Sequence, residues 1–211
     1  MIRHVWFDFA GTLYKETPEL QAARDVVRYS EYAKITHLTD LDEAKNQYDA
    51  LLAEAGSNSA VFSSLGKPDD YWQRISEGVD LTAYIKPDPV ITETLRELSS
   101  SLPISIFTNF RLQRVTRMLQ TLEISPQFFT HVLTGDNVQA RKPDLDGFKQ
   151  MIVLSEVPAN EIIYIGDRVS ADVAPAKVLG IVTCLVWQQS VEADYSTVDF
   201  SRLPEIIRQA V

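Results

Sequence analysis

The fold is decided by the segment IRHVWFDFAGTL, residues 2–13. A largely apolar run from Ile2 to Phe7 ends at a carboxylate, Asp8, and a glycine turn follows at once. An apolar run of this length that is bounded by a turn predicts a buried strand. In open α/β sheets, ligands bind beyond the carboxyl ends of the strands. The segment therefore predicts the first strand of an α/β domain, with Asp8 at the edge where chemistry takes place.

The chain from residue 87 onward alternates between helical and strand periodicity. Strands are expected at residues 104–107, 131–134, 162–165 and 183–187, with helices between them and a last helix at 203–211. This alternation is typical of βαβ units around a parallel sheet. The expected fold is thus α/β, a Rossmann-like doubly wound parallel sheet with strand order 3-2-1-4-5, which places the first strand beside the fourth.

The first and second strands are separated by about seventy residues, which is too long for a simple loop in a compact domain. Apolar residues recur at helical spacing within this insert. Helices are expected at residues 19–34, 41–55 and 69–76, the second one beginning with Asp40 and Glu43 as a capping pair. The predicted organisation is a small α-helical cap domain, residues 15–85, inserted into a core domain of residues 1–14 and 86–211.

Composition limits the classes of partner. The chain has 211 residues and a formal net charge of -9. No basic cluster occurs along it, which argues against nucleic acid or an anionic membrane surface as a partner. The single cysteine, Cys184, lies in an apolar run and is expected to be a buried structural thiol. With no membrane-length apolar stretch and no room for a signal peptide before the first strand, the expected location is the cytoplasm. The oligomeric state leaves no signal in the sequence.

Three further motifs follow predicted strands or lie between them. Thr108-Asn109 follows the strand at 104–107, and Lys142-Pro143-Asp144 lies between the next two strands. The segment from Gly166 to Asp172, with Asp167 inside it, follows the strand at 162–165. Together with the Asp8 segment, these pieces resemble the four motifs of the haloacid dehalogenase (HAD) superfamily. Receiver-type signalling domains also combine Asp, Thr or Ser and Lys on such a sheet, but here the Asp ends the first strand and an insert interrupts the sheet.

The resemblance implies phosphoryl transfer. A carboxylate can attack a phosphoryl group and form an aspartyl-phosphate, which divides one difficult displacement into two easier ones. Asp8 is the candidate nucleophile. Thr108 and Asn109 are expected to bind phosphoryl oxygens, and Lys142 to hold the nucleophile and the phosphate together. Arg168, inside the last motif, is a further candidate contact to the phosphate or to the aspartates.

The same resemblance implies a magnesium site. The carboxylates of Asp8, Asp167 and Asp172 offer hard oxygen ligands, which suit Mg²⁺ better than zinc or copper. In the family, the backbone carbonyl at the position of Ala10 also binds the metal. Three carboxylates, one Mg²⁺ and Lys142 together carry a formal charge of about zero before substrate binds.

Ala10 departs from the family pattern, because the first motif usually reads Asp-x-Asp-x-Thr and its second Asp is the general acid and base. Such acid-base work is worth typically 10²- to 10⁴-fold in rate. Three functions remain open. The first is a magnesium-dependent hydrolase of a small phosphorylated compound. The second is an enzyme similar to phosphonoacetaldehyde hydrolases, whose motif reads Asp-Trp-Ala-Gly-Thr and which need a cap lysine, for which Lys34 and Lys45 are available. The third is a non-catalytic binding or regulatory protein.

Haloacid dehalogenases also lack the second Asp, usually with Tyr in its place, and work without metal. The presence of both Asp167 and Asp172 argues against that chemistry. Among the other polar residues, Arg111 and Arg114 are expected on a solvated helix face. The three histidines have no metal-ligand spacing and receive no role.

Overall fold

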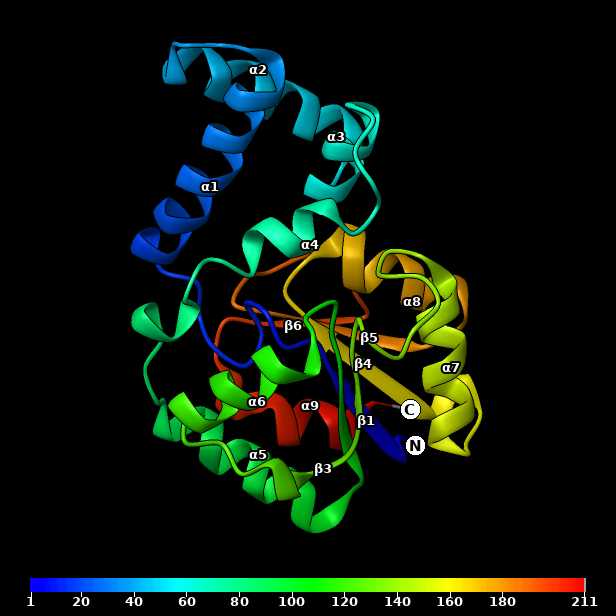
Figure 1. Ribbon diagram of the computed structural model, residues 1–211. Helices are drawn as coiled ribbons and strands as arrows, with labels where there is room; N and C mark the ends of the chain where they lie inside the picture. The colour runs from blue at the N-terminus through cyan, green and yellow to red at the C-terminus, as the bar shows by residue number, and fades with distance from the viewer. Residues whose placement is uncertain (211) are drawn as a thin grey trace. The chain divides into compact units, whose positions relative to one another are not determined.

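The computed structural model describes residues 1–210 and divides them into two compact units (Figure 1). The first unit comprises Met1–Lys15 and the chain from Ile85 onward, and the second is Glu16–Tyr84. Val211, which the sequence predicted as the end of the last helix, lies outside the described residues.

The first unit contains a six-stranded sheet in the order β3-β2-β1-β4-β5-β6, and every strand pair in it is parallel. The strands are β1 (His4–Phe7), β2 (Ile104–Phe107), β3 (Phe129–Leu133), β4 (Ile162–Gly166), β5 (Val182–Val186) and β6 (Tyr195–Thr197). The predicted strand order is confirmed for the first five strands. The short edge strand β6 was not predicted, because its three residues carry no apolar run.

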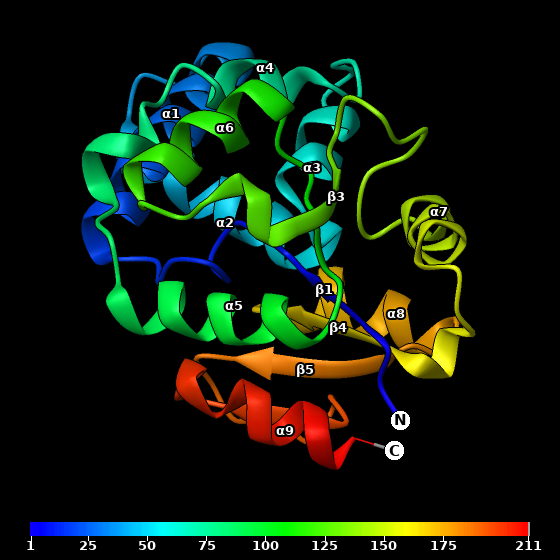
Figure 2. The same cartoon turned by 90° about the horizontal axis from the view of Figure 1, so that it is seen from below.

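Helices cover both faces of this sheet. They are α5 (Pro89–Ser101), α6 (Leu112–Thr121), α7 (Leu145–Ser155), α8 (Ala174–Val178) and α9 (Leu203–Gln209), with short 3₁₀ turns at Pro126–Phe128, Ala159–Glu161 and Phe200–Arg202. Helix α5 lies beside α9, and α7 lies beside α8 (Figure 2). Between the strands predicted at 162–165 and 183–187, the structure has a π-helical turn, η4 (Val169–Val173), followed by α8 in place of a single regular helix.

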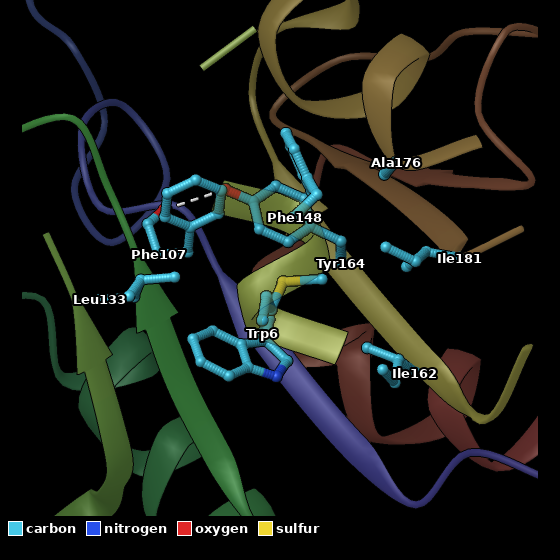
Figure 3. Packing of buried hydrophobic residues seen from close by; sticks show 9 residues of the cluster. Trp6, Phe107, Leu133, Phe148, Ile162, Tyr164, Ala176 and Ile181 are labelled. Atoms are coloured by element: carbon cyan, nitrogen blue, oxygen red, sulfur yellow. Dashed lines mark hydrogen bonds between the residues drawn. The ribbon is translucent and has the colours of Figure 1, made fainter. Parts of the chain in front are cut away.

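The larger hydrophobic core lies between the sheet and helices α7 and α8 (Figure 3). Trp6 and Tyr164 are paired in register on β1 and β4, so their side chains point to the same face. Phe148 of α7 packs against Tyr164 with ring centroids 5.1 Å apart, and Phe107 of β2 lies 5.1 Å from Phe148. Each fully buried side chain of this size contributes roughly 1.5–3 kcal/mol. A Cβ on Gly147 would lie 2.2 Å from Cζ of Phe107, so glycine is needed for this approach.

The neighbouring residues on each strand point to the opposite face of the sheet, where they form a second part of the core. Phe7 stacks on Phe200, with ring centroids 6.2 Å apart. Cys184 on β5 is fully buried, as predicted, and burial raises the pKa of its thiol to about 12. A thiol with such a pKa is protonated at neutral pH and is not a nucleophile.

The second unit is helical, with α1 (Pro18–Thr36), α2 (Leu41–Ala55), α3 (Asn58–Ser64), α4 (Tyr71–Ser76) and the 3₁₀ turn η1 (Leu81–Tyr84). Asp40 caps α2 as predicted, accepting hydrogen bonds from the backbone N–H groups of Asp42 and Glu43. The small core of this unit is aromatic and centres on Tyr48 and Phe62, whose ring centroids lie 5.8 Å apart. Helix α3 was not predicted, because it has only seven residues and four of them are polar. Of the helices in residues 1–210, none combines the length and the apolar character needed to cross a bilayer.

Candidate active site

The strand ends bring the predicted motifs to one edge of the sheet. Phe7 is in register with both Ile106 of β2 and Ile165 of β4. The next residue, Asp8, therefore leaves the sheet between the ends of these two strands, and its backbone N–H donates to Ile165 O at 2.8 Å. On the other side, the backbone N–H of Thr108 donates to Leu133 O at 3.0 Å, which fixes the start of the loop after β2.

Lys142 lies at the centre of this edge. Its Nζ is 2.8 Å from Oδ1 of Asp8 and 2.7 Å from Oδ1 of Asp172. It also donates to the hydroxyl of Tyr164 at 2.7 Å. The lysine side chain has no exposed surface, and its carboxylate partners are at most 1% exposed. A buried ammonium in this position is stable because all three of its donors have acceptors.

The backbone of Lys142 is held by a side chain from the neighbouring loop. The Lys142 N–H donates to Oδ1 of Asn109 at 2.8 Å, and Nδ2 of Asn109 donates back to Lys142 O at 2.9 Å. The paired hydrogen bonds join two segments that are 33 residues apart. Asn109 therefore positions the lysine, while Thr108 is buried beside it with its hydroxyl accepting from Phe110 N at 3.3 Å.

Asp172 reaches the site from the π-helical turn that follows β4. Its Oδ2 accepts from the backbone N–H of Arg168 at 3.1 Å, while its Oδ1 faces Lys142. Gly166 leaves the space that this carboxylate needs, because a Cβ there would lie 2.5 Å from Cβ and Cγ of Asp172. π-Helical turns are frequent at functional sites, and this one aims a buried carboxylate at the lysine.

Asp167 directly follows β4 and lies against the turn after β1. Gly11 has φ +78°, and a Cβ on it would lie 2.4 Å from Oδ2 of Asp167. The hydroxyl of Thr12 donates to Oδ1 of Asp167 at 3.4 Å, and Gln188 donates to the Asp167 backbone carbonyl at 2.6 Å. Glycine at position 11 thus serves both the left-handed backbone and the close approach of this carboxylate.

The three carboxylates form a group that fits a divalent cation. One ligand oxygen from each of Asp8, Asp167 and Asp172 lies within 4.8 Å of the other two. Within residues 1–210, Oδ2 of Asp8 is buried and has no hydrogen-bond partner. A buried carboxylate oxygen without a partner is costly, and a hard cation would satisfy it. The donor set, all oxygen, agrees with Mg²⁺ rather than with a soft metal.

Burial dominates the electrostatics of the site. Removal of Asp8 from water raises the pKa of its carboxyl group, the charge of Lys142 opposes that rise, and the negative charge of Asp172 adds to it. The pKa of the Tyr164 hydroxyl is raised well above 10 by burial and by the charges of Asp172 and Asp8. Tyr164 is therefore protonated, so it can donate to Phe107 O at 2.9 Å while it accepts from Lys142.

The remaining candidates lie around this centre. Ala10 is half-buried in the turn after Asp8, and Arg168 is exposed beside the buried carboxylates. Arg114 is buried, and its guanidinium lies over the ring of Phe110, 4.8 Å from the centroid. The prediction of a solvated face is wrong for Arg114, because the adjacent aromatic ring covers its side chain. Arg111 is partly exposed and pairs with Asp136 at 3.8 Å.

Tyr164 was not predicted as a site residue. In the sequence it stands inside the apolar strand run Ile162 to Ile165 and resembles an ordinary core residue. A tyrosine in a fully buried parallel strand needs a partner for its hydroxyl, and this requirement was the available signal.

The fold and the site define a Rossmann-like α/β domain, whose parallel sheet carries a buried Asp-Lys-Asp arrangement at its carboxyl edge. Residues 5–186 match the family model described as haloacid dehalogenase-like hydrolase. The chain belongs to this family and is an enzyme of the hydrolase class.

Two curated relatives and one solved structure agree with this family assignment. Glyceraldehyde 3-phosphate phosphatase of Methanocaldococcus jannaschii is 29% identical over 224 aligned residues, covering 98% of this chain and 96% of the relative. Phosphoglycolate phosphatase of Vibrio parahaemolyticus is 28% identical over 191 residues, covering 85% of this chain and 81% of the relative. The crystal structure of a HAD phosphatase from Thermococcus onnurineus superposes with a TM-score of 0.70 at 22% identity, covering 98% of both chains, and shows that the fold is shared.

Proposed function

We propose that the protein is a magnesium-dependent phosphatase that hydrolyses a small phosphorylated metabolite through an aspartyl-phosphate on Asp8. One observation carries the proposal. The Asp8 carboxylate is buried with one oxygen held 2.8 Å from Lys142 and the other without a partner, beside two further carboxylates. The names of the two curated relatives, which are phosphatases of three-carbon and two-carbon phosphate esters, support a small substrate.

Asp8, Asp167 and Asp172, with the backbone carbonyl of Ala10, would hold Mg²⁺. Bound there, the cation would neutralise phosphoryl oxygens and reduce their repulsion of the attacking carboxylate. The chain's own contribution is the pairing of Lys142 with Asp8 and Asp172, in which the positive charge of Lys142 opposes the rise that burial causes in the pKa of Asp8.

In the first chemical step, a carboxylate oxygen of Asp8 forms a bond to phosphorus while the bond from phosphorus to the ester oxygen breaks. The ester oxygen leaves with the electron pair and takes its proton from solvent water. In the second step, water attacks phosphorus, the bond to Asp8 breaks, and inorganic phosphate leaves with one of the water's protons while its other proton replaces the one taken from solvent. Thr108 and the backbone that follows it would bind the phosphoryl oxygens during both steps.

Ala10 sets the substrate range in this proposal. The methyl group of alanine can neither protonate a leaving alkoxide nor activate water. Leaving groups that are stable as anions, as in aryl and acyl phosphates, suffer least from this loss. The helical unit, Glu16–Tyr84, would act as a cap that selects the substrate, and the single buried cysteine fits a reducing compartment such as the cytoplasm.

The test is a turnover screen of the purified protein with aryl, acyl and alkyl phosphates and phosphonates, with and without Mg²⁺. We expect weak activity on aryl and acyl phosphates that requires Mg²⁺. Ala10→Asp should raise turnover of alkyl phosphates by about 10-fold or more and change aryl phosphate turnover less, because only alkyl leaving groups depend on the added acid. If both proteins are inactive while Mg²⁺ still binds, the phosphatase proposal fails and a non-catalytic binding function replaces it.

The phosphonatase alternative needs a lysine of lowered pKa in the helical unit. Lys34 pairs with Glu31, and Lys45 pairs with Asp49, each at 2.8 Å, and both lysines are exposed. The hydrogen bond that Lys45 donates to Asp49 raises the pKa of Lys45, which is opposite to the change that a Schiff-base lysine requires. Borohydride trapping of phosphonoacetaldehyde on either lysine would nevertheless favour that alternative.

A further inference from the structure

The ammonium group of Lys142 has a third partner besides the two carboxylates, and this partner comes from the core of the sheet. The hydroxyl of Tyr164 on β4 accepts from Lys142 Nζ at 2.7 Å. It donates to the backbone carbonyl of Phe107 at 2.9 Å (Figure 3). Phe107 is the last residue of β2 and directly precedes Thr108. One buried hydroxyl therefore connects the lysine to the start of the phosphate-binding loop.

The ring beneath this hydroxyl is held on two sides. The Tyr164 ring lies 5.1 Å from Phe148 and 6.2 Å from Phe107, and the residue is 1% exposed. Lys142 Nζ lies 5.3 Å from the ring centroid of Tyr164 and 5.4 Å from that of Phe107. The hydroxyl therefore cannot move without displacing core side chains, so it offers the Lys142 ammonium an acceptor at a fixed position.

A lysine side chain is a flexible four-carbon stem that ends in a point charge with three donors. Two contacts, to Oδ1 of Asp8 and to Oδ1 of Asp172, leave the ammonium free to rotate about the line that joins them. The third contact removes this freedom. Without it, one buried N–H group of the ammonium would also lack an acceptor.

We propose that Tyr164 is a positioning residue, whose hydroxyl fixes the Lys142 ammonium between Asp8 and Asp172 and ties it to the loop that begins at Thr108. The inference rests on the proposed phosphatase function for its kinetic consequence, but its structural part can be measured without turnover. The hydroxyl of Tyr164 bonds to Lys142 and to Phe107 O, so it acts through Lys142.

The decisive variant is Tyr164→Phe, which keeps the ring in the core and removes only the hydroxyl. Ser155→Ala is its matched control. The Ser155 hydroxyl is also buried, accepts from Trp6 Nε1 at 2.8 Å and donates to Met151 O at 2.8 Å, but it has no contact with Lys142. Each variant thus deletes one buried hydroxyl that accepts one hydrogen bond and donates another, and thermal unfolding of both shows how much stability each one loses.

With p-nitrophenyl phosphate and Mg²⁺, Tyr164→Phe should lower kcat by roughly 10- to 100-fold, the scale expected for a misplaced catalytic group, with KM changed less than about 3-fold. Ser155→Ala should keep the wild-type kcat. In ¹⁵N-labelled protein, the Lys142 ammonium should be protected from proton exchange in the wild type and in Ser155→Ala, and should lose that protection in Tyr164→Phe.

An unchanged kcat in Tyr164→Phe, or a fall that Ser155→Ala matches, would overturn the inference. Unchanged ammonium protection in Tyr164→Phe would overturn it as well. If the wild type hydrolyses no phosphate ester, the proposed function fails, and the ammonium measurement alone then decides whether Tyr164 positions Lys142.

Discussion

His4, at the start of β1, gives the core unit a built-in sensitivity to acid. Its side chain is 3% exposed, stacks on Trp6 at 5.4 Å and on His131 at 6.1 Å, and Nε2 shares a hydrogen bond with the hydroxyl of Ser105 at 2.9 Å. Burial, and then the nearby charge of His131, lower the pKa of His4 from 6.5 to about 4. The folded protein therefore holds His4 in its neutral form at neutral pH.

The sign of the effect follows from proton binding. Between pH 6.5 and about 4, the unfolded chain binds a proton at His4 and the folded chain does not, so acid favours unfolding. The contribution to stability is complete above pH 6.5 and is lost as the pH falls toward 4. From these two pKa values, the free energy of unfolding should fall by about 2 kcal/mol between pH 7 and pH 5 because of His4 alone. This interval lies above the range in which most carboxylates titrate.

The measurement is urea unfolding of the wild type and of His4→Gln at a series of pH values from 7 to 5. Glutamine keeps a polar group for Ser105 but does not titrate. Between pH 7 and pH 5, the free energy of unfolding of His4→Gln should therefore fall by about 2 kcal/mol less than that of the wild type. His37→Gln is the control, because His37 is exposed at the end of α1. Equal pH dependence in the wild type and in His4→Gln would refute the reasoning, whatever the absolute stability of the variant.

Three further predictions concern the site. Asp8→Asn should abolish turnover in a phosphate-release assay and leave the circular dichroism spectrum unchanged, because the amide is nearly isosteric but cannot form the aspartyl-phosphate; retained activity would exclude covalent catalysis by Asp8. Asp167→Asn should weaken Mg²⁺ binding by at least about 10-fold in calorimetry, and wild-type affinity in this variant would remove Asp167 from the metal site. Gly166→Ala should lower turnover by roughly 100-fold, because its Cβ would lie 2.5 Å from Asp172 and displace the carboxylate; normal kinetics would mean that the turn adapts at no cost.

The sequence was sufficient to predict the sheet order and the clustering of the motifs, because both depend on where apolar runs end. Asp8, Thr108 and Asp167 each follow a strand directly or by one residue, so parallel pairing brings them to one edge. Lys142 follows no strand. Its position depends on the Asn109 side chain, which holds its backbone across 33 residues, and such long-range contacts leave no local pattern.

The features that could not be predicted are those that depend on tertiary packing. Tyr164 is a core residue by its ring and a site residue by its hydroxyl. The sequence signals that a buried hydroxyl needs a partner, but only tertiary packing shows that the partner is Lys142. Arg114 has the spacing of a solvated residue, but the ring of Phe110 changes its environment. The π-helical turn before α8 likewise breaks the regular periodicity from which helices are predicted, and this break is what directs Asp172 to Lys142.

Ala10 shows that the fold and the chemistry of the leaving group depend on different atoms of the same turn. The turn closes through backbone groups, since Phe9 O accepts from Thr12 N at 3.3 Å and from Leu13 N at 3.1 Å, and Gly11 supplies the left-handed conformation. The side chain at position 10 takes no part in these contacts. Alanine in place of the usual aspartate therefore leaves the backbone contacts around Asp8 unchanged. Alanine at this position also means one fewer negative charge to repel an approaching phosphate anion. We therefore expect phosphate binding to persist whether or not turnover is efficient, so binding cannot distinguish an enzyme from a binding protein, whereas the dependence of rate on the leaving group can.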